Sequence, residues 1–195
     1  MSDTISVALT LFLIIDPLGN IPIFMSVLKH VPEERKRKIL LLELIISLGL
    51  MLIFLWTGSV LLDALRLSTQ AIAISGGIIL LIVAFRMIFP SRGGVMGDES
   101  FDEEPLIVPL ATPLIAGPSV LATLVLLSEN NPERTIDWTL ALFIAWLAAS
   151  TIFLFSQTLF RSLGVRGLKA IERLMGMLLI SIAVQMLLNA FPSLI

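Results

Sequence analysis

The stretch that decides the fold is Asp16-Pro17-Leu18-Gly19-Asn20-Ile21-Pro22, which interrupts the first long apolar segment of the chain. A carboxylate at membrane depth is costly and marks a functional site by default. Each proline removes a backbone donor and crowds the carbonyl four residues earlier, so a helix breaks there. Broken backbone at that depth is tolerated only where protein or a water-filled cavity covers it. The stretch therefore predicts a broken membrane helix beside a polar site.

The same pattern of prolines occurs in the second half of the chain. Pro17 and Pro22 recur 96 residues later as Pro113 and Pro118, with Gly117 between the second pair. Matched breaks in two halves of one chain are typical of secondary transporters, which bind their substrates near the bilayer midplane where the halves meet. The spacing therefore predicts a transport site built from both stretches.

The composition is that of an integral membrane protein. Of the 195 residues, 57% are hydrophobic and 14% are charged, and the mean hydropathy is +1.00. A soluble domain carries about 25% charged residues. The absence of cysteine excludes disulfides and thiolate metal sites, and a single histidine, His30, is a poor basis for a transition-metal site. We therefore expect no metal and no cofactor. We also expect no nucleic-acid partner, because no basic patch is interleaved with aromatic residues.

The hydropathy pattern predicts six membrane-spanning helices, since a span needs about 20 apolar residues. Eleven of the 13 lysines and arginines lie in or beside the loops that join odd-numbered to even-numbered segments. The positive-inside rule then places these loops in the cytoplasm and both termini outside. The predicted spans cover residues 5–28, 39–62, 69–88, 106–127, 138–160 and 174–191.

The chain divides into two predicted repeats of three spans, residues 1–90 and 106–195. The segment between them, residues 91–105, is rich in glycine and acidic residues and reads as a flexible cytoplasmic linker. Gly77 in the third span matches Gly176 in the sixth at an offset of 99 residues. Because three is an odd number, the second repeat must enter the membrane the other way up. This predicts an inverted repeat, related by a pseudo-two-fold axis in the membrane plane.

Asp16 has two readings. As a site residue it would bind a coupling proton or cation, or the amino group of a substrate. As a cap it would begin the half-helix that follows, with Pro17 at the first position. Its counterpart in the second half, Thr112, also caps well but carries no charge. The predicted site therefore has one carboxylate, supplied by the first half.

The residues that flank the breaks are further candidates for contact with a substrate. Gly19 and Gly117 let a ligand approach the backbone, and Asn20 and Ser119 offer hydrogen bonds to a small polar ligand. Alternatively, these side chains satisfy backbone groups that the prolines leave without partners. Half-helix N-termini near the two glycines are expected to attract a substrate carboxylate.

Small and polar residues in the third and sixth spans complete the predicted cavity. Gly76, Gly77 and Gly176 are expected to form its floor, although small residues serve close helix packing at least as often. Gln185 is expected to line the cavity or to bridge two helices, and it is also a candidate for a gate or a proton relay.

Glu43 and Arg86 are candidates for a gate or a proton relay. Both lie near the predicted cytoplasmic ends of their spans. The alternative reading is that each side chain extends to the membrane surface by snorkelling.

These motifs resemble the MarC family, and most closely its YhgN-type members of the bacterial inner membrane. The family is also called the small neutral amino acid transporter, or SnatA-like, family. The resemblance implies six spans in a 3+3 inverted repeat and movement of small neutral amino acids, such as alanine or glycine, coupled to protons. The stretches that carry it are residues 15–24, 75–78, 112–118 and 172–176.

The leading functional hypothesis is a secondary transporter of small neutral amino acids that works by alternating access. An exporter of another small solute and a non-transporting assembly or regulatory subunit are the alternatives. An enzyme is not expected, because the chain offers neither a cysteine pair nor a nucleophile elbow nor a phosphate loop. The expected partners are the substrate, protons and the lipid bilayer, and the sequence leaves a homo-oligomer open.

Overall fold

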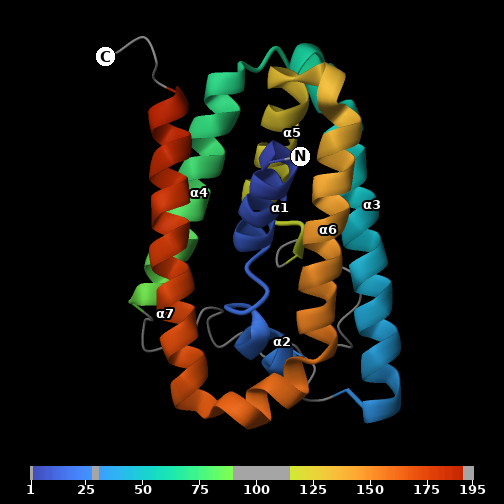
Figure 1. Cartoon of the computed structure of the whole chain (residues 1–195), viewed down its shortest axis with the longest axis vertical. Coiled ribbons are helices and arrows are strands. Elements are labelled where there is room, and N and C mark those ends of the chain that lie inside the picture. Colours follow the sequence, from blue (N-terminus) through green and yellow to red (C-terminus); the bar gives the residue numbers. More distant parts are fainter. Residues whose placement is uncertain (1, 28–30, 90–114, 191–195) are drawn as a thin grey trace.

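A computed structural model describes residues 2–27, 31–89 and 115–190, and all regular secondary structure in these ranges is helical (Figure 1). The prediction of an all-α protein is confirmed for this part of the chain. Thr112, Pro113 and the linker 91–105 lie outside the described residues. The elements are α1 Ser2–Ile15, α2 Ile21–Val27, α3 Glu33–Leu65, α4 Thr69–Ile88, α5 Pro118–Asn130, η3 Pro132–Arg134, α6 Thr135–Leu154 and α7 Ser156–Ala190.

Among the residues that the structure describes, four helices are long and apolar enough to cross a membrane. They contain the stretches Arg35–Leu65, Thr69–Ile88, Pro132–Leu154 and Arg166–Ala190. The first predicted span is divided between the shorter helices α1 and α2, and the described part of the fourth is α5. The prediction that the fifth span continues to residue 160 is wrong, because α6 ends at Leu154 and the polar Ser156 opens α7. Hydropathy averaged over a window does not detect a turn as short as the one between Leu154 and Ser156.

Local capping sets the tight connection between α3 and α4. Arg66 follows α3 with φ 52° and ψ 38°, and the next residue, Leu67, donates its N–H to the Leu62 carbonyl. A left-handed residue with this bond is the Schellman ending of a helix. Ser68 then caps α4, because its hydroxyl accepts the Ala71 N–H at 3.2 Å. The two spans therefore run antiparallel with three residues between them.

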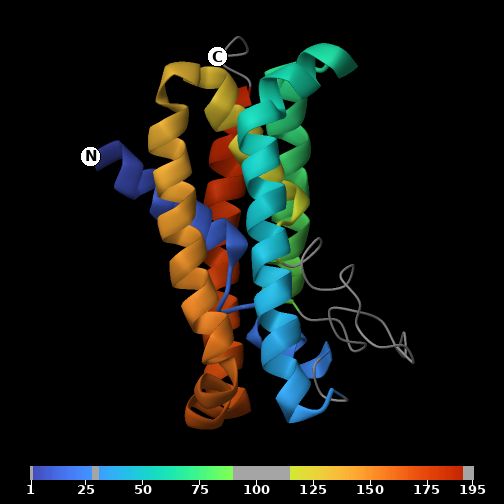
Figure 2. The same ribbon diagram turned by 90° about the vertical axis from the view of Figure 1, so that its right-hand side faces the viewer.

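Helices from the two halves of the chain pack against each other throughout the bundle. α4 packs along α7, α1 packs on α6, and α5 packs on α3 (Figures 1 and 2). Each pair joins one helix of the first half to one helix of the second. The first helix of each half thus packs on the helix of the second predicted span of the other half.

The contact between α4 and α7 is reciprocal. A Cβ atom added to Gly77 would lie 3.2 Å from the carbonyl oxygen of Ala183, and one added to Gly176 would lie 3.1 Å from that of Ala84. The offset of 99 residues between the halves relates Gly77 to Gly176 and Ala84 to Ala183. The contact of Gly77 with Ala183 is therefore the counterpart of the contact of Gly176 with Ala84. Contacts that exchange in this way are what a two-fold relation between two helices produces.

Apolar side chains form both the core and the outer surface. In the core, the rings of Phe24 on α2 and Phe153 on α6 stack with centroids 4.4 Å apart. On the outside, large apolar residues such as Ile53 and Val60 of α3 are exposed. Such exposure suits helices that are surrounded by lipid, because acyl chains are as apolar as leucine.

Candidate functional site

Asp16 follows the last residue of α1 and begins the turn that leads to α2. Its φ is 48°, in the left-handed region that Asp and Asn tolerate better than other non-glycine residues. Its N–H still donates to the Phe12 carbonyl at 3.1 Å, and its Oδ1 accepts the Gly19 N–H at 3.2 Å. The side chain is only 4% exposed. Asp16 therefore closes a turn with its side chain and does not cap α2, which begins at Ile21, and its carboxylate lies inside the bundle.

Gly19 and Asn20, later in the same stretch, support this turn. Asn20 Nδ2 donates to the Ile15 carbonyl at 3.0 Å and so satisfies a backbone group freed at the end of α1. A Cβ atom on Gly19 would collide with the Asp16 carboxylate and with the terminal methyl of Met87 on α4. Glycine is therefore required at position 19 by close approach. Both residues act as scaffold here, and contact with a substrate stays a prediction.

The second stretch reaches the same interior from the other half. Gly117 precedes α5 in an extended conformation, and Pro118 occupies the first position of that helix, where its missing N–H costs nothing. Ile115 and Ala116 are fully buried and belong to the same core as Ile15, and Ser119 is 7% exposed. The end of α1 and the start of α5 thus meet in one core.

Glu43 lies deeper than the sequence indicated. Its side chain is 1% exposed, and Ser47, one turn later on the same face of α3, is fully buried. A carboxyl group so placed does not reach the surface, as snorkelling would require. Ser150 on α6 is also buried, and its hydroxyl has no hydrogen-bond partner within the described residues. The interior of the bundle therefore holds several polar groups besides Asp16.

The other predicted site residues lie elsewhere. Arg86 is exposed, in keeping with snorkelling. Gln185 is also exposed, and its Nε2 donates to Asn189 Oδ1 at 2.7 Å on the same helix. Gly76 is buried against α5, where an added Cβ atom would lie 2.7 Å from that of Ala122. Gly77 and Gly176 pack between α4 and α7, so helix contact accounts for all three glycines, and a cavity floor stays a prediction.

Sequence reasoning missed Glu172 as a neighbour of Asp16. It is half-buried on α7, and its charge interacts with that of Asp16. The last predicted span, residues 174–191, begins just after Glu172. Because α7 begins at Ser156, Glu172 instead lies well inside the helix. No local pattern signals this, since the approach joins residues far apart in the chain.

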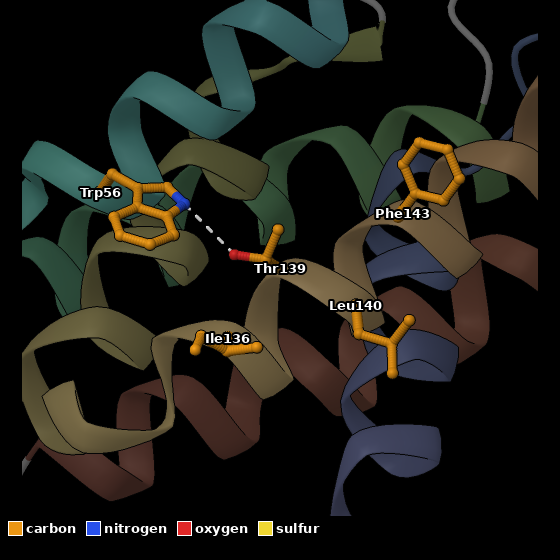
Figure 3. A pocket seen from close by; sticks show the side chains of 5 residues that line it. All are labelled: Trp56, Ile136, Thr139, Leu140 and Phe143. Atoms are coloured by element: carbon orange, nitrogen blue, oxygen red, sulfur yellow. Dashed lines mark hydrogen bonds between the residues drawn. The ribbon is translucent and has the colours of Figure 1, made fainter.

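A groove on the outer face of α3 and α6 has a different character (Figure 3). Its volume is about 320 Å³, and it is lined by Trp56, Ile136, Thr139, Leu140 and Phe143. Trp56 Nε1 donates to Thr139 Oγ1 at 3.2 Å, and the remaining lining is apolar. With no charged group in it, the groove does not suit a zwitterionic solute. Within the described ranges, no three acidic or histidine side chains converge on a metal position.

Comparison with known proteins gives full-length matches. The family described as "MarC family integral membrane protein" matches residues 1–195. The "UPF0056 inner membrane protein YhgN" of Escherichia coli (strain K12) is 49% identical over 189 residues, covering 97% of this chain and 96% of that protein. A UPF0056 membrane protein of Buchnera aphidicola subsp. Baizongia pistaciae is 46% identical, with 99% and 98% covered. One from Pyrococcus abyssi is 32% identical, with 92% and 89% covered. No solved structure matches.

Proposed function

This chain belongs to the MarC family of integral membrane proteins, and on that premise we propose that it is a secondary transporter of small neutral amino acids in the bacterial inner membrane. The observation that carries the proposal is the buried carboxylate of Asp16, held in a helix break at the meeting of the two halves. Intramembrane carboxylates are costly, and in transporters they mark substrate and ion pathways.

The architecture we propose is six spans in a 3+3 inverted repeat, with the first and fourth spans broken and both termini on the periplasmic side. The exchange of contacts between Gly77 and Gly176 supports it, as does the packing of each half's first helix on the other half. Halves related in this way can rock against each other about a fixed site, which is how alternating access operates in such folds.

The chemistry of the site suits a small zwitterion. Asp16 would bind the ammonium group of the substrate or a coupling proton. The N-terminus of α5, with its buried Ser119, would face the substrate carboxylate, since the first amides of a helix carry partial positive charge. Thr112 and Gly117 would complete the part of the site that faces the substrate carboxylate. Alanine and glycine are the substrates we expect, because the surrounding core is closely packed.

Two further carboxylates would carry the coupling proton. Glu172 interacts electrostatically with Asp16 from α7, and Glu43 is buried on α3. Protons commonly cross membrane proteins along chains of such groups. We propose that Asp16 and Glu172 exchange the proton with substrate binding, and that Glu43 connects them to the cytoplasmic side.

The first experiment is a comparison of solutes inside and outside cells that overexpress the protein and cells that lack it. Candidates are then tested by uptake of labelled alanine or glycine into proteoliposomes. We expect uptake by the wild type and loss in Asp16→Asn. Asp63→Asn is the matched control, because Asp63 is exposed at the end of α3. Absence of uptake of any amino acid by the wild type would overturn the substrate class, and a partner protein that co-purifies would then favour a non-transporting subunit.

A further inference from the structure

Helix α7 changes direction near its start. Gly164 has φ 62° and ψ 174°, a conformation that side chains on Cβ disfavour. Residues 156–163 consequently lie across the end of the bundle, while the rest of α7 runs along it (Figures 1 and 2). An added Cβ atom at Gly164 would meet nothing within 4 Å, so the backbone angle alone calls for glycine.

Four basic side chains surround this bend. Arg161, Arg166, Lys169 and Arg173 are all exposed, and none of them forms an ion pair with another residue that the structure describes. Glu172 is the single acidic residue in α7; it is half-buried and interacts electrostatically with Lys169 and Arg173. The bend therefore carries positive charge at Arg161 and Arg166 that no carboxylate in the described residues matches by an ion pair.

At the opposite end of the bundle, Arg134 forms ion pairs with protein carboxylates. Arg134 contacts Asp3 and Asp137, each at 3.0 Å, and its guanidinium lies 4.5 Å from the ring centroid of Trp138. Protein carboxylates therefore match the charge of Arg134, whereas no ion pair among the described residues matches that of Arg161 or Arg166.

We propose that the bend of α7 binds the phosphate group of an anionic phospholipid. A helix that lies in the membrane interface with basic residues on its surface is attracted to anionic headgroups. Phe155 and Leu163 are 60% and 38% exposed beside the bend, so apolar side chains are available to enter the acyl layer below the headgroup. Arginine also matches phosphate geometrically through its planar fork. This inference does not depend on transport.

The test uses the full-length protein in neutral detergent, with phosphatidylglycerol or phosphatidylcholine added, and counts bound lipids by native mass spectrometry. The wild type should retain phosphatidylglycerol in preference to phosphatidylcholine. Attraction to anionic surfaces changes by about five-fold for each basic side chain. The double variant Arg161→Gln/Arg166→Gln should therefore lose most of the preference, and Arg161→Lys/Arg166→Lys, which keeps the charges, should retain most of it.

The control variant Arg37→Gln/Lys38→Gln removes the same charge from the start of α3 and should keep the preference. Equal loss in both glutamine variants would show a response to net charge alone and would overturn the site. Equal retention of the two lipids by the wild type would also overturn it. Displacement of the lipid by inorganic phosphate at millimolar concentration would indicate a free-anion site instead. A thermal unfolding scan on each variant verifies that it is folded.

Discussion

Gly19→Ala is the substitution that tests the turn around Asp16 most sharply. The new methyl group would occupy the positions of the Asp16 carboxylate and of the Met87 methyl, so at least one of them must move. Overpacking of a core costs about 1–3 kcal/mol. Loss of the bond from the Gly19 N–H to the Asp16 carboxylate costs about 1.5–3 kcal/mol more. Because the two effects overlap, we expect a destabilisation of about 2–5 kcal/mol.

The assay is reversible unfolding in mixed detergent micelles, compared with Gly49→Ala. Gly49 lies within α3, and a Cβ atom added there meets nothing within 4 Å. Alanine should therefore stabilise the helix at that position by about 1 kcal/mol. If Gly19→Ala were as stable as Gly49→Ala, the carboxylate would not be held over Gly19, and the geometry from which we argue the site would be incorrect.

Four further substitutions test the packing of the two halves, each by unfolding in the same micelles. Gly77→Ala and Gly176→Ala should cost similar amounts, about 1–3 kcal/mol each, because their contacts are reciprocal; a cost at only one position would argue against the two-fold relation. Phe24→Ala removes a fully buried ring that stacks on Phe153 and should cost about 3–5 kcal/mol, whereas a cost below about 1 kcal/mol would place α2 outside the core. Trp146→Phe breaks the 2.9 Å bond to an α3 carbonyl and should cost about 0.5–1.5 kcal/mol; no cost would mean that this bond does not hold α6 to α3.

The sequence was sufficient where a local rule decides the structure. The prolines and glycine of the first stretch stop α1 at Ile15, and Pro118 opens α5 after Gly117. Apolar length identified the stretches that became α3 and α4. In these places a missing donor, a required left-handed angle or a run of leucines acts within a few residues, so the pattern and the structure coincide.

The sequence was insufficient where distant residues meet. α7 begins at Ser156, well before the predicted last span, so Glu172 lies within the helix and interacts electrostatically with Asp16. Burial of Glu43 likewise depends on which face of α3 its neighbours cover. Hydropathy averages over a window and gives no information about either effect. The helix break at Asp16 was therefore predicted from the sequence, whereas the position of Glu172 and the burial of Glu43 were not.

The most direct test of the central claim is counterflow in proteoliposomes. Vesicles loaded with unlabelled alanine are diluted into a trace of labelled alanine, and the label inside is followed over time. The proposal predicts transient accumulation with the wild type and with Asp63→Asn, and none with Asp16→Asn. Equal accumulation with Asp16→Asn would show that the buried carboxylate of Asp16 does not serve the transport of alanine.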